Sequence, residues 1–66
     1  MAMIKPYDKV RINSPRFQSE GVPSGSIGFV AELWDDGNLE VEVPLEPRSA
    51  LVTPQPAELE LLQTIP

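Results

Sequence analysis

Eight prolines and four glycines divide this 66-residue chain into short segments. No segment repeats apolar residues at the three- and four-residue spacing of an amphipathic helix for more than a turn or so. Short alternating runs separated by Pro and Gly are instead typical of small all-β domains. We therefore expect one all-β domain over residues 1–66, with an ordered core of about residues 4–62 and a frayed tail at 63–66.

Five short runs have the composition of β-strands. Residues 13–26 form a long first loop, which either packs through Phe17 and Val22 or is mobile. Residues 54–58 have the pattern of a single 3₁₀ turn, with Pro56 suited to its first position. This order of parts predicts a small five-stranded SH3-like barrel, closed or nearly so, because closure removes exposed strand edges. The expected strands are residues 9–12, 27–34, 39–43, 49–53, in which Leu51 and Val52 enter the core, and 59–62.

The sequence Asp35-Asp36-Gly37-Asn38 predicts a hairpin turn, because Gly37 adopts positive φ without steric cost. A two-residue loop would leave Glu32 among valines, and burying an unpaired carboxylate is unfavourable. We therefore expect a three-residue loop at residues 35–37, which fixes the face of every flanking side chain. The expected core face contains Ile27, Phe29, Ala31, Leu33, Leu39, Val41 and Val43. The expected outer face contains Val30, Glu32, Trp34, Asn38, Glu40 and Glu42.

Composition narrows the possible functions. The chain contains no Cys and no His, so it lacks disulfides, the usual zinc ligands and the commonest groups of acid–base and nucleophilic catalysis. We expect a non-enzymatic protein without a metal or cofactor. Its N-terminus has no apolar stretch long enough for a signal peptide or a membrane span, which predicts a cytoplasmic protein.

Charge is distributed unevenly along the chain. Residues 1–31 contain four cations and two carboxylates, whereas residues 32–66 contain one arginine and eight carboxylates, a net charge of −7. The segment ELWDDGNLEVEVPLE, residues 32–46, holds six of these carboxylates and the only tryptophan. An acidic field favours basic protein partners, and an exposed tryptophan is a frequent binding hot spot. The predicted partner-binding residues are Glu32, Trp34, Asp35, Asp36, Glu40 and Glu42.

Two positions of Trp34 stay open at this point. It either faces outward with the glutamates, or it folds over an open end of the barrel or under the loop at residues 13–26. Phe17 and Tyr7 are expected to close the end of the barrel, since aromatic side chains tend to pack.

The stretches IKPYDKVRI, GVPSGSIGFVAELWDDGNLEVEV and ALVTPQPAELELL together resemble a family of small bacterial SH3-like proteins known only as a domain of unknown function, family four-nine-two-six. Leu39 and Val43 stand where that family more often has aromatic residues. The resemblance implies an SH3-like fold and no established activity, and it suggests an immunity or antitoxin-like role. The positions that carry it are Asp8, Gly25, Gly28, Val30, residues 39–43, residues 50–53, Pro56, Leu59 and Leu62.

Two alternative functions remain. The step Gly25-x-x-Gly28-x-Val30 is similar to that of KOW domains, which implies binding of RNA or a ribonucleoprotein through Lys9, Arg11 and Arg16. The low pI of about 4.4 argues against nucleic acid, and we expect these cations to pair with glutamates of the third strand. Gly28 also has a structural explanation, since glycine lets a strand bend sharply. The other alternative is a small structural subunit of a larger complex.

Overall fold

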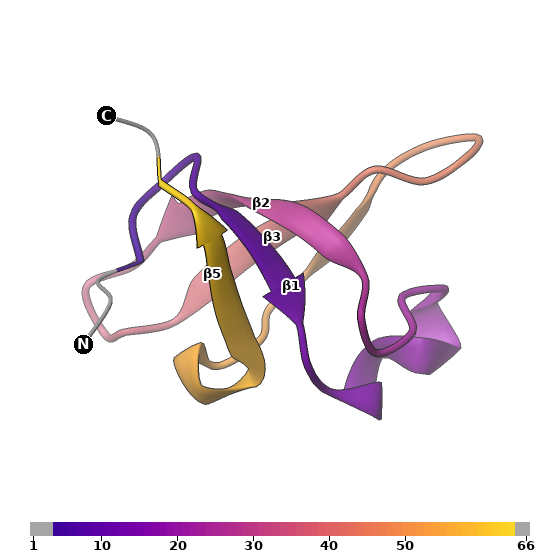
Figure 1. Ribbon diagram of the computed structural model, residues 1–66, viewed down its shortest axis with the longest axis horizontal. Coiled ribbons are helices and arrows are strands. Elements are labelled where there is room, and N and C mark those ends of the chain that lie inside the picture. The colour runs from indigo at the N-terminus through magenta and orange to yellow at the C-terminus, as the bar shows by residue number, and fades with distance from the viewer. Residues whose placement is uncertain (1–3, 65–66) are drawn as a thin grey trace.

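The computed structural model describes residues 4–64, which form an all-β fold of five antiparallel strands (Figure 1). The strands are hydrogen-bonded in the order β4-β3-β2-β1-β5, so the last strand returns to lie beside the first. The predicted all-β fold of five short strands is confirmed. Within the described residues the strands form one sheet that is not closed into a barrel, because β4 and β5 do not pair. The strands are β1 (Lys9–Ile12), β2 (Ile27–Leu33), β3 (Leu39–Val43), β4 (Ala50–Val52) and β5 (Leu59–Gln63).

The long first loop is packed against the core. It contains a 3₁₀ helix that the sequence did not predict, η1 (Pro15–Glu20), whose first turn is capped by the Ser14 hydroxyl. Gly21 ends η1 in the left-handed conformation at φ 84°, which favours glycine. Phe17 and Val22 are both buried, so the loop is held by its own apolar side chains.

The predicted 3₁₀ turn before the last strand is confirmed as η2 (Pro56–Glu58), with proline at its start. The end of the chain differs from the expected frayed tail. β5 continues to Gln63, and the Thr64 hydroxyl donates a 2.9 Å hydrogen bond to Asp8 Oδ1. Asp8 is fully buried and its Oδ2 also accepts from the Lys5 backbone N–H at 2.8 Å. This carboxylate therefore joins the two ends of the described chain, while residues 65–66 lie outside the described residues.

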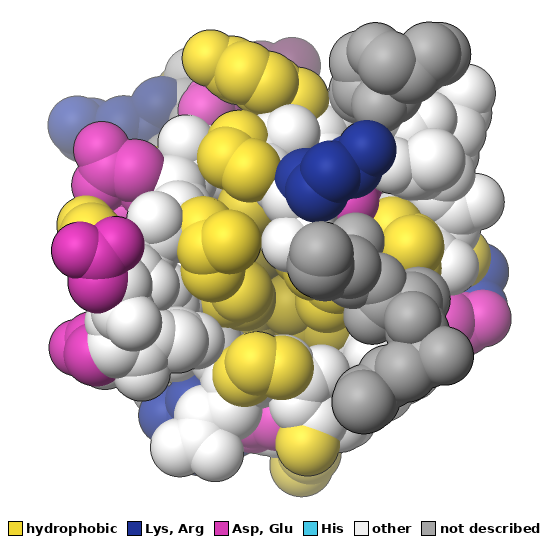
Figure 2. All heavy atoms as spheres, turned by 90° about the vertical axis from the view of Figure 1, so that its left-hand side faces the viewer, with side chains coloured by type: hydrophobic (Ala, Val, Ile, Leu, Met, Phe, Trp, Pro, Cys, Tyr) yellow, Lys and Arg dark blue, Asp and Glu magenta, His cyan; other side chains and the backbone are white. Residues whose placement is uncertain are grey.

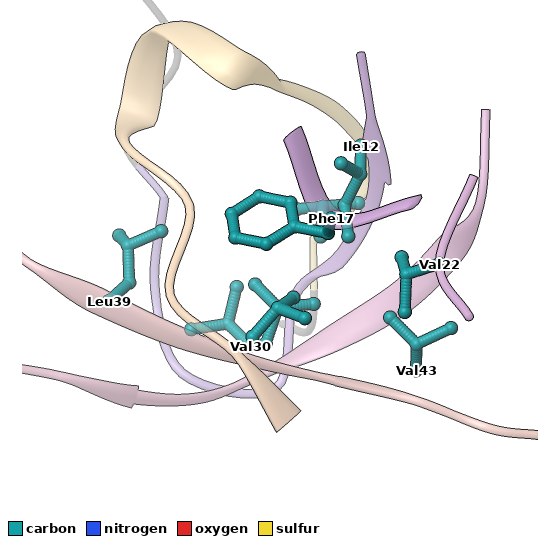
Figure 3. Close-up of a cluster of buried hydrophobic side chains, with 9 residues drawn as sticks. Ile12, Phe17, Val22, Val30, Leu39 and Val43 are labelled. Carbon is teal, nitrogen blue, oxygen red and sulfur yellow. The ribbon is translucent and has the colours of Figure 1, made fainter. Parts of the chain in front are cut away.

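Within residues 4–64, nine buried hydrophobic side chains make up the core (Figure 3). The Phe17 ring extends into the middle of this cluster and is buried, so Phe17 is part of the core. Tyr7 instead is 70% exposed, because its backbone, at φ 74°, forms a turn at the surface. The core residues are Val10, Ile12, Phe17, Val22, Val30, Leu39, Val41, Val43 and Val52.

The hairpin between β2 and β3 has the predicted three-residue loop. The Trp34 backbone N–H donates to the Asn38 carbonyl at 2.9 Å, and the Gly37 N–H donates to the Trp34 carbonyl at 3.0 Å. Leu33 then pairs with Leu39, as that loop requires. Gly37 has φ 89°, which is why a glycine suits this position.

The predicted faces of β2 are wrong upstream of the hairpin. Val30 pairs with Val41 and Glu32 with Glu40, so Ala31 is an extra residue on β2. An extra residue of this kind, a β-bulge, reverses the inward–outward alternation on one side of it. Val30 is consequently buried, with 1% of its surface exposed, and Phe29, expected in the core, is 45% exposed.

Other predicted core residues also lie at the surface. Ile27 shares the outward orientation of Phe29 and is 41% exposed, and Ala31 is exposed at the bulge. Leu33 is on the side of the buried Leu39, but it lies at the end of the sheet and stays partly exposed. On β4, Val52 enters the core as expected, whereas Leu51 points outward.

Gly28 is inward-facing and lies unusually close to β3. A Cβ atom at this position would be 2.6 Å from the Glu42 carbonyl oxygen and 2.9 Å from Val41 Cγ1. Such contacts are too short, so a residue without a side chain is required where β2 passes over β3. This close approach explains the glycine in structural terms.

Candidate functional site

The turn of the hairpin uses part of the predicted acidic cluster for its own structure. Asp36 accepts a hydrogen bond from the Asn38 backbone N–H at 3.1 Å and another from the Asn38 side-chain amide at 3.0 Å. Asp turns of this type are stabilised by such local bonds. Asp35 and Asp36 are both exposed at the tip, and Asp36 is best explained by turn formation.

The remaining predicted residues share the outer surface of the hairpin. Glu32 lies directly opposite Glu40. Trp34 follows the end of β2, two positions beyond Glu32, and its backbone still pairs with Asn38, so the alternation places its side chain on the same face as Glu32. Glu42 follows Glu40 at the same spacing, between the buried Val41 and Val43. We call these four residues, Glu32, Trp34, Glu40 and Glu42, the acidic face.

Trp34 is exposed. It retains 41% of its surface in contact with solvent, which answers the question that the sequence left open. The space under the first loop is filled by Phe17 and Val22. Figure 2 views the molecule from the side that carries the β2–β3 turn in Figure 1, and it shows acidic side chains along one edge of a central hydrophobic area.

The structure adds apolar residues to this surface that the sequence did not predict. Phe29 pairs with Glu42, and Glu42 pairs on its other side with Leu51, so the three side chains point outward in one row. Leu51 is 56% exposed. Glu42 therefore lies between two exposed apolar side chains. The signal in the sequence was Gly28: a glycine required for close approach faces inward, and the alternation then turns Phe29 outward.

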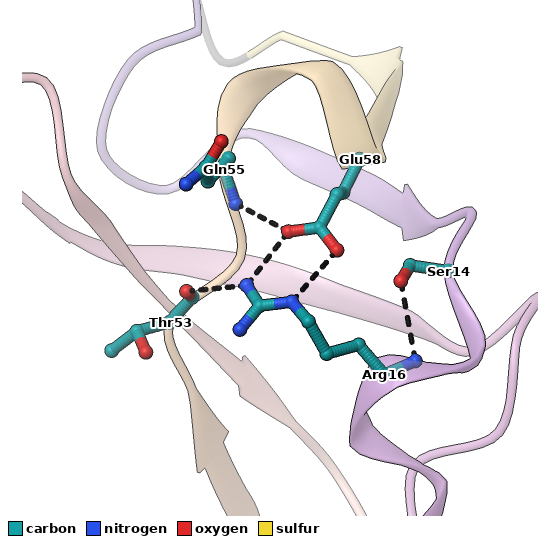
Figure 4. A network of polar contacts seen from close by, with 5 residues as sticks. All are labelled: Ser14, Arg16, Thr53, Gln55 and Glu58. Atoms are coloured by element: carbon teal, nitrogen blue, oxygen red, sulfur yellow. Dashed lines mark hydrogen bonds and ion pairs between the residues drawn. The ribbon is translucent and has the colours of Figure 1, made fainter.

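The cations proposed for RNA binding are largely engaged within the chain. Arg11 forms an ion pair of 3.1 Å with Glu60 of β5. Arg16 binds both carboxylate oxygens of Glu58, at 2.8 and 3.0 Å, and also donates to the Thr53 carbonyl (Figure 4). The expected pairing with glutamates of the third strand is therefore wrong, because the sheet order brings the end of the chain beside β1.

The Arg16–Glu58 contact shifts the titration of both groups. Hydrogen bonds from Arg16, with a further one from the Gln55 backbone N–H, lower the pKa of Glu58 to about 2. The same carboxylate raises the pKa of Arg16. The Arg16 guanidinium also lies 4.4 Å from the centre of the Phe17 ring, a distance typical of a cation–π contact. This cluster connects η1 to η2, so we assign it a structural role.

The described part of the chain offers few other sites. Residues 4–64 enclose no pocket, and none of their carboxylates gather in groups of three that could hold a metal ion. No helix in this range is long and apolar enough to cross a membrane. The acidic face is therefore the strongest candidate site. Comparison of the chain with protein-family models, curated proteins and solved structures finds no match.

Proposed function

We propose that this protein is a non-enzymatic binding module that recognises a basic surface of another protein through the acidic face. The observation that carries this proposal is the exposure of Trp34 on the same face as Glu32, Glu40 and Glu42. A large aromatic side chain supplies most of the contact energy in many interfaces, and the surrounding charges select the partner.

The pairing of Glu32 with Glu40 supports a basic partner. Like charges directly opposite each other across two strands destabilise a sheet. Within residues 4–64 no Lys or Arg forms an ion pair with either carboxylate. A cation supplied by a partner would relieve the repulsion between Glu32 and Glu40. The repulsion present in the free protein would therefore make binding of a basic partner more favourable.

In its finer form, the proposal is an immunity or antitoxin-like protein of the cytoplasm that covers a basic surface of a toxin. The net charge of −7 on residues 32–66 supports it, as does the resemblance to family four-nine-two-six. RNA binding receives less support, because contacts with phosphates would have to compete with the ion pairs of Arg11 and Arg16.

A kinetic comparison of matched charge reversals tests the proposal. The partner is isolated by affinity purification from the native host, and its association rate with Glu40→Lys is compared with that of Glu20→Lys. Both variants change the net charge by two units, but Glu20 ends η1, away from the β2–β3 turn (Figure 1). We expect Glu40→Lys to slow association and flatten its salt dependence, and Glu20→Lys to have a smaller effect.

Trp34→Ala provides the second measurement. A hot-spot residue contributes about 2 kcal/mol or more, which corresponds to a roughly 30-fold faster dissociation. An association rate that is independent of salt and unchanged by Glu40→Lys would refute the electrostatic part. Unchanged dissociation of Trp34→Ala would remove the tryptophan from the interface.

A further inference from the structure

The outer face of the sheet presents a cation, an aromatic ring and an anion side by side. Lys9 on β1 pairs with Phe29 on β2, and Phe29 pairs with Glu42 on β3. Directly paired residues point to the same side of a sheet, and the neighbours of these three residues along their strands, Val10, Val30 and Val41 among them, are buried. We call this set the Lys9–Phe29–Glu42 row.

The centre of this row is apolar and open to solvent. Phe29 exposes nearly half of its surface, and Ile27, two residues earlier on β2, points the same way and is similarly exposed. Neighbouring strands are about 4.8 Å apart, which places Lys9 and Glu42 roughly 10 Å from each other on either side of the ring. Neither residue forms an ion pair with another side chain of residues 4–64.

We infer that this face packs against the same face of a second copy of the chain. In this dimer the sheets of the two copies face each other. The two-fold axis lies between them, above β2 and parallel to it. This symmetry brings β1 of each copy over β3 of the other. The three residues of the row are at one level of the sheet, so Lys9 of each copy meets Glu42 of the other copy. The two Phe29 rings meet at the axis, where aromatic pairs contribute most when they are offset or edge-to-face.

Within the Lys9–Phe29–Glu42 row, charge complementarity favours a second copy of the chain as the occupant, and it favours an axis parallel to β2 over one that crosses the strands. An axis across the strands would set Lys9 against Lys9 and Glu42 against Glu42, which is repulsive. The parallel axis instead creates two opposite-charge contacts, as a self-complementary two-fold interface requires. A partner that is basic throughout would match Glu42 but repel Lys9. This inference does not rest on the proposed function. Glu42 belongs both to the row and to the acidic face, so the tests of the proposed function use Trp34 and Glu40, which lie outside the row.

A charge-swap experiment tests the dimer. Sedimentation equilibrium of the unaltered chain over a range of concentrations is expected to show a reversible monomer–dimer equilibrium. Lys9→Glu alone sets two carboxylates against each other, and Glu42→Lys alone sets two ammonium groups against each other. Each variant should weaken the dimer by about tenfold or more. An equimolar mixture should form a mixed dimer close in affinity to the original one, because both charge pairs are restored.

Several results would overturn the inference. A chain that remains monomeric up to millimolar concentration does not self-associate through this face. A dimer that survives both charge reversals unchanged uses another surface, and a mixture no stronger than its components removes the proposed pairing. Circular dichroism checks that each variant is folded. If either charge reversal does not fold, Phe29→Lys serves instead, since it places two cations at the axis and should abolish the dimer.

Discussion

Replacing Val30 with alanine should lower the free energy of unfolding by about 2.5 kcal/mol. Val30 is 1% exposed and pairs with the equally buried Val41. Removing two methyl groups forfeits about 1.6 kcal/mol of transfer free energy. The void they leave, roughly 40 Å³, adds about 1 kcal/mol. A domain of this size has a total stability of roughly 3–10 kcal/mol, so the loss is a large fraction of it.

The matched control is Phe29→Lys, at the residue that precedes Val30 on the same strand. The bulge at Ala31 turns Phe29 to the surface, where a lysine can lay its aliphatic stem along the sheet and keep its charge in water. Although this substitution alters the side chain more than Val30→Ala does, we expect the free energy of unfolding to change by no more than about 1 kcal/mol. If β2 instead had the alternation expected from the hairpin loop alone, Phe29→Lys would bury a charge and unfold the protein.

Thermal unfolding followed by far-ultraviolet circular dichroism separates the two cases. For a chain of this length, about 2.5 kcal/mol corresponds to a decrease in Tm of roughly 10–20 °C. The melts are repeated at several concentrations, because any dimer through Phe29 adds a concentration-dependent contribution. A stable Val30→Ala variant together with an unfolded Phe29→Lys variant would refute the assignment of the faces of β2.

Two further predictions concern structural residues. Gly28→Ala should destabilise the fold by about 1–3 kcal/mol in urea denaturation, because its Cβ would meet the Glu42 carbonyl oxygen at 2.6 Å; unchanged stability would show that β2 and β3 can separate there freely. The lowered pKa of Glu58, about 2 against an ordinary 4.5, predicts stability that is present above pH 4.5 and decreases as the pH falls toward 2. Urea titrations of Glu58→Gln should lack this component, and Arg16→Gln should lack most of it; a wild-type pH dependence in Glu58→Gln would contradict it.

Much of the fold could be predicted from local sequence patterns. The Pro and Gly positions separated the five strands, and Pro56 marked the 3₁₀ turn of η2. The burial penalty of a carboxylate correctly chose the three-residue loop at residues 35–37. That choice placed Glu32 and Glu40 opposite each other on an outer face, as observed. The candidate acidic face therefore follows from the sequence, although the exposure of Trp34 did not.

The orientation of β2 was decided by tertiary structure. The side chains of a strand alternate with a period of two, and this pattern does not indicate where an extra residue is inserted. The bulge at Ala31 therefore could not be predicted from the alternation alone. Pairing Val30 with Val41 puts the valines of three strands in one core layer, since Val41 also pairs with Val52. Packing of these distant strands favours the bulge and exposes Phe29.

The partners of the arginines depended on the fold in the same way. Arg11 and Arg16 are 49 and 42 positions from the glutamates they bind. Composition established an acidic, Cys-free and His-free all-β chain with its negative charge in the second half. Only the return of β5 to the side of β1 brought Glu58 and Glu60 to those cations. Within residues 4–64, Glu32, Glu40 and Glu42 have no Lys or Arg as an ion-pair partner. Local patterns thus specified the strands and the turn, whereas contacts between strands far apart in sequence determined which residues the surface presents.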